Sequence, residues 1–178
     1  MDFTEVFFKF YSSEDFKSDL LTPELIEKAD FVFQDAVAML LSLIGYSVIV
    51  LGKKKRKNKE LDKLRLESKV VVGSLDLIAF RENNKLFIIE CTIDIVDDPK
   101  IRKLQKIVNY FSSEEDRKYS KVMGVIFSSQ DCKDIGRHYY EDIRIIDARI
   151  LKIILDLILK GENKEARSRF LSFDYPRD

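Results

Sequence analysis

The feature that most constrains the fold is a regular alternation between short apolar, strand-like segments and amphipathic, helix-like segments. Residues 46–51, 70–80, 86–90, 122–128 and 143–146 are rich in Val, Ile, Leu and Phe, as buried strands are. Between and around them, apolar residues recur at helical spacing. The order helix, three strands, helix, strand, helix, strand, helix predicts an α/β fold with a mixed central β-sheet of about five strands flanked by helices.

Capping signals predict where the helices begin and end. Thr22-Pro23-Glu24 is typical of a helix start, and Gly45 ends the apolar stripe that follows it. Asp97-Asp98-Pro99 is a second start signal, because Asp caps a helix and Pro is tolerated in its first turn. A short helix is expected around residues 134–140, and a last one over Ala148 to Lys160, before a glycine.

A chain of 178 residues fits one domain, and 46% hydrophobic residues with only 6 Gly and 3 Pro exclude a disordered protein. We expect residues 31–178 to form this domain, with residues 1–30 as an N-terminal extension packed on it. The two cysteines and one histidine are too few for a disulfide framework or a zinc cluster. Reduced thiols are therefore expected.

The chain carries 31 Lys and Arg against 31 Asp and Glu residues, so it is no polycation, and any nucleic-acid site must be local. One stretch, residues 53–69, is strongly basic, with nine basic residues against three acidic ones. It is either a solvated loop or a segment that contacts nucleic-acid phosphates. Its candidate DNA-binding residues are Lys53, Lys54, Lys55, Arg56 and Lys57.

The N-terminus has Asp2 and Glu5 where a secretory signal would be basic, so a cytoplasmic location is expected. Residues 36–52 carry no charge and approach the length of a membrane span. Gly45 and the β-branched second half of this stretch favour a helix followed by a strand instead. No membrane association is predicted.

Two carboxylates lie in otherwise apolar strand segments, Asp76 in GSLDLIAF and Glu90 in LFIIECT. An ionised carboxylate in a half-buried strand is unfavourable unless it is paired or binds a cation. Oxygen ligands from Asp76, Glu90 and the backbone carbonyl of Cys91 suit Mg²⁺ or Mn²⁺ better than zinc. The alternative is that each carboxylate forms its own ion pair at the sheet edge.

The connection between these two strands determines whether the carboxylates can share a cation. A three-residue loop, residues 82–84, places Asp76 directly opposite Glu90 with both side chains on one face of the sheet. A two-residue turn at Asn83-Asn84 places them on opposite faces. A shared site therefore requires the odd loop or a bulge.

Five segments in order, FQDAVAMLLSLIGYSV, SLDLIAF, LFIIECT, KVMGVIFSS and IRIIDARILKII, with a basic helix after the third, resemble the PD-(D/E)XK nuclease superfamily. The chain looks closest to Mrr-type restriction endonucleases and archaeal Holliday-junction resolvases, over about residues 31–158. This resemblance implies a restriction-endonuclease-like core and a nuclease that depends on Mg²⁺ or Mn²⁺.

The resemblance also implies roles for individual residues. Asp76 and Glu90 match the acidic residues of the family's first and second catalytic motifs, although Leu75 stands where Pro is often found. The Cys91 carbonyl matches the usual backbone metal ligand. Gln34 stands where many members have a helical Glu that supports the metal site.

The main departure from the family pattern is Thr92, which stands at the position of the family's lysine. Some members with Thr there resemble this chain in having basic residues on the following helix, which implies a migrated lysine. At ~100° per residue, Lys100 lies beside the buried stripe of that helix and Lys103 farther out on the same flank. Lys103 is slightly favoured over Lys100, and the alternative is that both are ordinary solvated lysines.

The resemblance implies an endonuclease that hydrolyses phosphodiester bonds of DNA. It is compatible with a homodimer as well as with a monomer. The alternative, favoured by Thr92, is a catalytically inactive nuclease-fold module that binds nucleic acid or serves as a scaffold. A third class is a partner-binding domain. It would use the aromatic residues near the N-terminus, Phe3, Phe7, Phe8, Phe10 and Tyr11.

Overall fold

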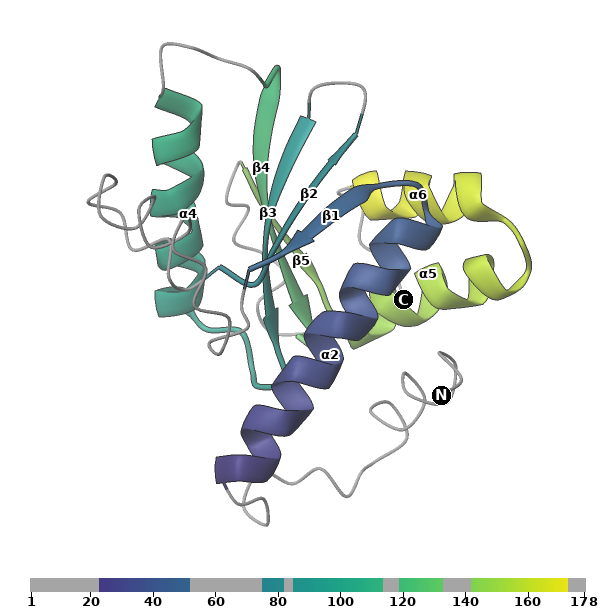
Figure 1. Cartoon of the computed structure of the whole chain (residues 1–178), viewed down its shortest axis with the longest axis horizontal. Helices are drawn as coiled ribbons and strands as arrows, with labels where there is room; N and C mark the ends of the chain where they lie inside the picture. The colour runs from purple at the N-terminus through teal and green to yellow at the C-terminus, as the bar shows by residue number, and fades with distance from the viewer. Residues whose placement is uncertain (1–22, 52–74, 82–84, 114–118, 133–141, 173–178) are drawn as a thin grey trace.

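The computed structural model describes residues 23–51, 75–81, 85–113, 119–132 and 142–172, with side chains described from residue 32 onward. Within these ranges the chain forms a five-stranded mixed sheet flanked by four helices (Figure 1). The elements are α2 (Pro23–Leu43), β1 (Ser47–Val50), β2 (Leu77–Arg81), β3 (Lys85–Thr92), α4 (Asp98–Ser113), β4 (Lys121–Ser128), β5 (Ile143–Ile146), α5 (Ala148–Leu159) and α6 (Asn163–Leu171).

The strands follow each other across the sheet in the order β1-β2-β3-β4-β5. The pairs β1–β2 and β2–β3 are antiparallel, whereas β3–β4 and β4–β5 are parallel. This arrangement confirms the predicted mixed sheet. It also brings the carboxyl ends of β3, β4 and β5 to one edge, where open α/β sheets commonly bind ligands.

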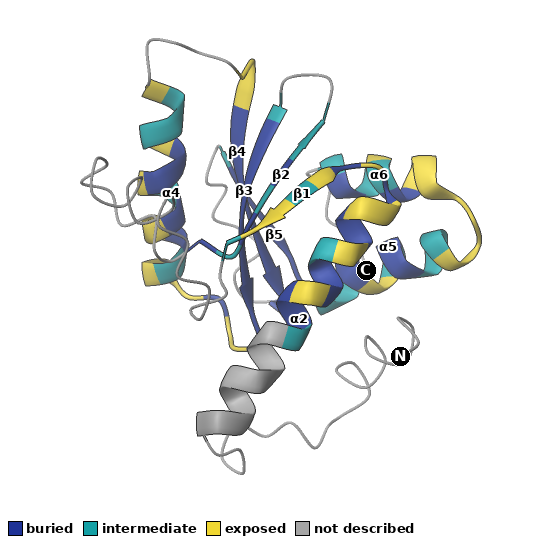
Figure 2. Ribbon diagram, viewed as in Figure 1, coloured by how far each residue is buried: buried dark blue, intermediate teal, exposed yellow. Residues whose placement is uncertain are grey.

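The sheet separates two apolar cores, because successive side chains of a strand point to opposite faces. In β3, Phe87 and Ile89 belong to the core with α2, α5 and α6, whereas Leu86 and Ile88 belong to the core with α4. Figure 1 shows α4 on one side of the sheet and the other three helices on the opposite side. Figure 2 shows that each helix buries one side and exposes the other.

Helix α2 ends as the sequence predicts, at a glycine. Gly45 has a φ of 90°, a left-handed conformation that favours glycine. The carbonyl of Ile44 accepts a hydrogen bond of 2.7 Å from Nε of Arg167, which comes from α6. At its other end α2 begins at Pro23, so one continuous helix crosses the boundary expected between residues 30 and 31.

The prediction that the helix after β5 is the last one is wrong. Helix α6 follows α5, and it is polar except for Ala166, Phe170 and Leu171. Ala166 and Phe170 are buried in the core shared with α2, and Leu171 is partly buried against it. Its last carbonyls, those of Arg169 and Phe170, accept hydrogen bonds from the guanidinium of the buried Arg144 on β5. Tertiary contacts therefore stabilise a helix that amphipathic patterning alone does not reveal.

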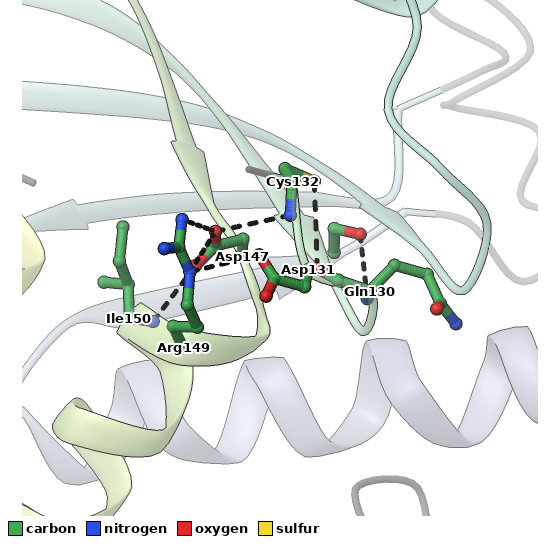
Figure 3. Close-up of polar contacts among 7 residues, drawn as sticks. Gln130, Asp131, Cys132, Asp147, Arg149 and Ile150 are labelled. Carbon is green, nitrogen blue, oxygen red and sulfur yellow. Dashed lines mark hydrogen bonds and ion pairs between the residues drawn. The ribbon is translucent and has the colours of Figure 1, made fainter. Parts of the chain in front are cut away.

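A buried carboxylate connects the end of β4 to the start of α5 (Figure 3). Asp147 is fully buried, and its Oδ1 accepts the Ile150 N–H at 3.1 Å as the N-cap of α5. Its Oδ2 accepts the Cys132 N–H at 3.4 Å and is bound by Arg149 Nη2 at 3.0 Å. Arg149 also contacts Asp131 at 3.1 Å. These contacts fix the segment that follows β4.

Some expectations lie outside the described residues. These are the basic stretch 53–69 with its five candidate DNA-binding residues, the helix expected at 134–140, and the aromatic residues near the N-terminus. No helix within the described ranges combines the length and apolar character needed to cross a lipid bilayer.

Candidate functional site

The register of the β2–β3 hairpin is the one required for a shared carboxylate site. Arg81 pairs with Lys85, and Leu77 pairs with Ile89. The connection is therefore the three-residue one, residues 82–84, and the two-residue turn is excluded. Regular pairing continued by one position beyond the last pair would place Asp76 opposite Glu90, although β2 itself begins at Leu77.

Asp76 lies immediately before β2, and both of its carboxylate oxygens are hydrogen-bonded. Oδ1 accepts from Gln34 Nε2 of α2 at 2.8 Å, and Oδ2 accepts from the backbone N–H of Cys91 at 2.7 Å. Leu75 belongs to the core on the α4 side, whereas Leu77 belongs to the opposite core. The backbone departs from regular strand alternation at Asp76, and its side chain binds a β3 amide where the β2 ladder ends.

Glu90 is the buried carboxylate of the site, with only 8% of its surface exposed. It alternates with residues of the core on the α4 side, and its Oε1 lies 3.5 Å from Nζ of Lys103 on α4. Its other oxygen, Oε2, is buried and has no hydrogen-bond partner among the described residues. A buried acceptor without a partner is unfavourable and is typical of a position that binds a cation or a water molecule.

Burial raises the pKa of Glu90 above its usual value. The nearby ammonium groups of Lys103 and Lys100 act in the opposite direction and lower this pKa, while the negative charge of Asp97 raises it. The desolvation penalty is the larger effect. A divalent cation would favour the charged carboxylate more strongly than one partly exposed lysine does.

Thr92 is contacted directly by a helix lysine. Nζ of Lys100 lies 3.1 Å from Thr92 Oγ1 and 3.2 Å from the carbonyl oxygen of Ile95. The same hydroxyl oxygen accepts the Asp94 N–H at 3.1 Å. An ammonium group therefore lies next to Thr92, at the position where the family resemblance leads one to expect a lysine.

The position of Lys100 follows from the start of α4. The side chain of Asp97 accepts the Lys100 N–H at 3.0 Å, which confirms the predicted cap and places Lys100 in the first turn. A cation in the first turn opposes the helix dipole, which favours negative charge there. A charge of the unfavourable sign at a helix end is a local conflict, and such conflicts are expected at functional sites.

Sequence reasoning missed the segment that holds the end of β3 in place. The Ser128 hydroxyl donates to the Asp94 carbonyl at 3.3 Å, and the Ser129 hydroxyl donates to the Ile93 carbonyl at 3.2 Å. Gln130 Nε2 also donates to the Ile93 carbonyl, at 3.0 Å. The signal was available, because three polar residues, Ser128, Ser129 and Gln130, end and directly follow an apolar strand whose carboxyl end lies beside that of β3.

The candidate residues from two helices and the start of β2 meet on three consecutive residues of β3. Gln34 donates to Asp76, and Asp76 accepts the N–H of Cys91. Lys103 reaches Glu90, and Lys100 reaches Thr92. Among the described residues, no three His, Cys, Asp or Glu side chains form a metal-binding group. A cation at this place would therefore depend on carboxylate, amide or carbonyl oxygens and on water.

The unpartnered acceptors fit an oxygen-binding cation. Besides Glu90 Oε2, the side-chain oxygen of Gln34 is buried and has no hydrogen-bond partner within the described ranges. Both are hard oxygen donors, which Mg²⁺ and Mn²⁺ prefer. Comparisons with models of protein families, with curated proteins and with solved structures found no match to this chain.

Proposed function

We propose that the protein is a Mg²⁺- or Mn²⁺-dependent DNA endonuclease that hydrolyses phosphodiester bonds at the Asp76/Glu90 site. The observation that carries this proposal is the convergence of Asp76, Lys103 and Lys100 on Glu90, Cys91 and Thr92 of β3. Carboxylates and ammonium groups at the carboxyl end of one strand provide what metal-assisted phosphodiester hydrolysis needs.

The side chains have distinct roles in this proposal. Asp76, Glu90 and the Cys91 carbonyl would hold the cation, which supplies a bound water of lowered pKa and positive charge toward the scissile phosphate. Gln34 orients Asp76 through its 2.8 Å hydrogen bond. Each helix lysine offers a donor: Lys103 to a phosphate oxygen near Glu90, and Lys100 to the attacking water or a phosphate oxygen near Thr92.

The test measures nicking of supercoiled plasmid in Mg²⁺ and in EDTA. Wild-type protein is expected to cleave only with the cation. Glu90→Gln should reduce cleavage by at least roughly 10²-fold with DNA affinity retained, because it removes a ligand charge and little volume. Asp76→Asn should act in the same direction, and exposed Glu165→Gln is the matched control. Full activity of Glu90→Gln, or cleavage in EDTA, would contradict the proposal.

Cation binding has a second readout that does not depend on cleavage. Mn²⁺ should raise the melting temperature of the wild-type protein, since a ligand at ~100 times its Kd stabilises the native state by about 2.7 kcal/mol. Glu90→Gln should abolish this shift, and Glu165→Gln should keep it.

A nucleic-acid-binding module without catalytic activity is the second candidate. It is favoured by Thr92 at the family's lysine position and by the lack of a three-ligand metal group among the described residues. Salt-dependent DNA binding by wild-type protein, without cation-dependent cleavage of duplex, junction, flap or single-stranded DNA, would favour this candidate.

A further inference from the structure

Helix α4 has one outer face that is basic over about the first half of the helix. The helix carries Lys100, Arg102, Lys103 and Lys106, and no acidic residue follows Asp98 within it. Arg102, Lys103 and Lys106 are exposed. At ~100° per residue these three fall within an arc of about 100°, so they form one face, here called the α4 basic face.

The opposite side of α4 is fully engaged with the sheet. Ile101, Leu104, Ile107 and Val108 are buried against the core on that side, and Figure 2 shows the exposed and buried sides of the helix clearly. No large apolar side chain of α4 is exposed. The α4 basic face is therefore purely polar, and the helix keeps no apolar face for a bilayer or for a protein partner.

The basic charge is available for binding. Within the described part of the chain, neither Arg102 nor Lys106 forms an ion pair or a side-chain hydrogen bond. The chain as a whole has a net charge of zero, so a cluster of one sign on one helix is a local feature. Asn109 and Tyr110 continue the surface along the helix with groups that can donate hydrogen bonds to phosphate oxygens.

The α4 basic face is continuous with the candidate site, because Lys103 contacts Glu90 at 3.5 Å. We propose that the α4 basic face binds the phosphate backbone of duplex DNA and directs it toward Glu90, with Arg102 and Lys106 as phosphate contacts outside the reacting centre. The inference deepens the proposed function and rests on it for the identity of the polyanion. Such contacts position the backbone and carry no sequence information.

The experiment is a salt titration of binding to a fluorescent duplex of about 20 base pairs in EDTA, so that no cleavage occurs, over about 50 to 200 mM salt. Arg102→Gln/Lys106→Gln should weaken binding roughly 3- to 10-fold and reduce the log K against log salt slope by up to ~1.8, about 0.9 for each lost contact. Lys152→Gln/Lys164→Gln is the control, because it removes the same charge from exposed positions on α5 and α6.

An unchanged slope in the α4 double variant, or an equal change in the control, would overturn the inference. So would wild-type protein that binds phosphatidylserine vesicles but not the duplex. If only the proposed function fails, the result is different. Wild-type protein then shows no cation-dependent cleavage, but the α4 double variant still loses salt-dependent binding. Cleavage by wild-type protein with an unaltered salt slope in the variant rejects the α4 face alone.

Discussion

At the scale of single residues, Thr92 and Lys100 form one hydrogen-bonded unit that places an ammonium group where the resembling family has a strand lysine. If this ammonium acts on the reaction, Lys100→Ala should lower turnover by roughly 10²- to 10⁴-fold, the range for a positioned proton-transfer or charge-stabilising group. Adding Thr92→Lys to that variant should restore much of the rate, because it returns the ammonium from β3 itself. Single-turnover cleavage at saturating DNA measures both effects.

Two comparisons make this prediction specific. Lys152→Ala, an exposed lysine on α5, should leave turnover unchanged. Lys103→Ala reports on the second helix lysine, so that the two candidates are separated. An unaltered rate in Lys100→Ala, Lys103→Ala and the double variant would show that neither lysine has migrated into the site.

Glu90 predicts a pH dependence of stability, because its pKa is raised in the folded protein. Between the ordinary and the raised pKa, the native state binds more protons than the unfolded state, so the free energy of unfolding falls as pH rises. Glu90→Gln should remove this fall, and its stability relative to wild type should increase across that window. Urea unfolding in steps from about pH 4 to pH 7 without divalent cations tests this; a constant difference between the two proteins contradicts it.

Residue-level prediction from sequence succeeded where alternation and reach determine the outcome. Alternation left two hairpin connections open, and the structure has the three-residue one. Helical geometry placed Lys100 and Lys103 on one flank of α4, and both contact β3. The proximity of Gln34 to Asp76 was implied by the family resemblance and not by spacing. The sequence favoured Lys103 only slightly over Lys100, because that choice depends on the side chains that hold each ammonium. Those partners, Thr92 Oγ1 and Glu90 Oε1, become adjacent only after packing.

At the scale of elements, α4 approaches the sheet closely at one glycine of β4. A Cβ atom at Gly124 would overlap Ile143 Cδ1 of β5 and lie 3.0 Å from Leu104 of α4. Gly124→Ala should therefore displace the helix, destabilise the protein by about 1–3 kcal/mol, and reduce cleavage per folded molecule because Lys100 and Lys103 move with α4. Urea unfolding and single-turnover cleavage measure the two effects.

Gly161→Ala is the matched control for this prediction. Gly161 has a φ of 77°, and no atom of the described residues lies within 4 Å of the added Cβ, so the variant should lose stability through backbone strain. The variant should keep full activity per folded molecule, since Gly161 follows α5, which lies on the other side of the sheet from α4. Equal losses of activity in the two variants would show that α4 placement is not the cause.

Elements with strong periodicity or a clear cap were predictable, and α6 was not. The start of α4 follows from Asp97 and Pro99, and the end of α2 follows from Gly45. Helix α6 has no side-chain hydrogen bond at its N-cap, Glu162, and buries only two residues, Ala166 and Phe170. The Phe170 ring packs against Tyr46, Phe87 and Phe127, residues distant in sequence that no local pattern connects to it.

At the scale of the whole molecule, the two ends of the described chain are joined by Arg167, which donates from α6 to the Ile44 carbonyl at the end of α2. Arg167→Ala should lower the free energy of unfolding by about 1–2 kcal/mol, because a charge-assisted hydrogen bond is lost and a helix carbonyl loses its partner. Exposed Lys164→Ala on the same helix should change it by less than about 0.5 kcal/mol. Equal values in urea unfolding would rule out this contribution.

The contact between Lys103 and Glu90 also implies competition. In the protein without ligands, the ammonium partly balances the Glu90 charge, and a divalent cation would take over that function. Lysine and cation are then antagonists for one carboxylate, although the proposed reaction needs both. In the proposed reaction Lys103, whose side chain is 45% exposed, would then be free to contact a phosphate oxygen of the substrate. Replacement of Lys103 would therefore increase the affinity of the site for the cation and lower the rate of hydrolysis. Cation affinity and turnover would change in opposite directions.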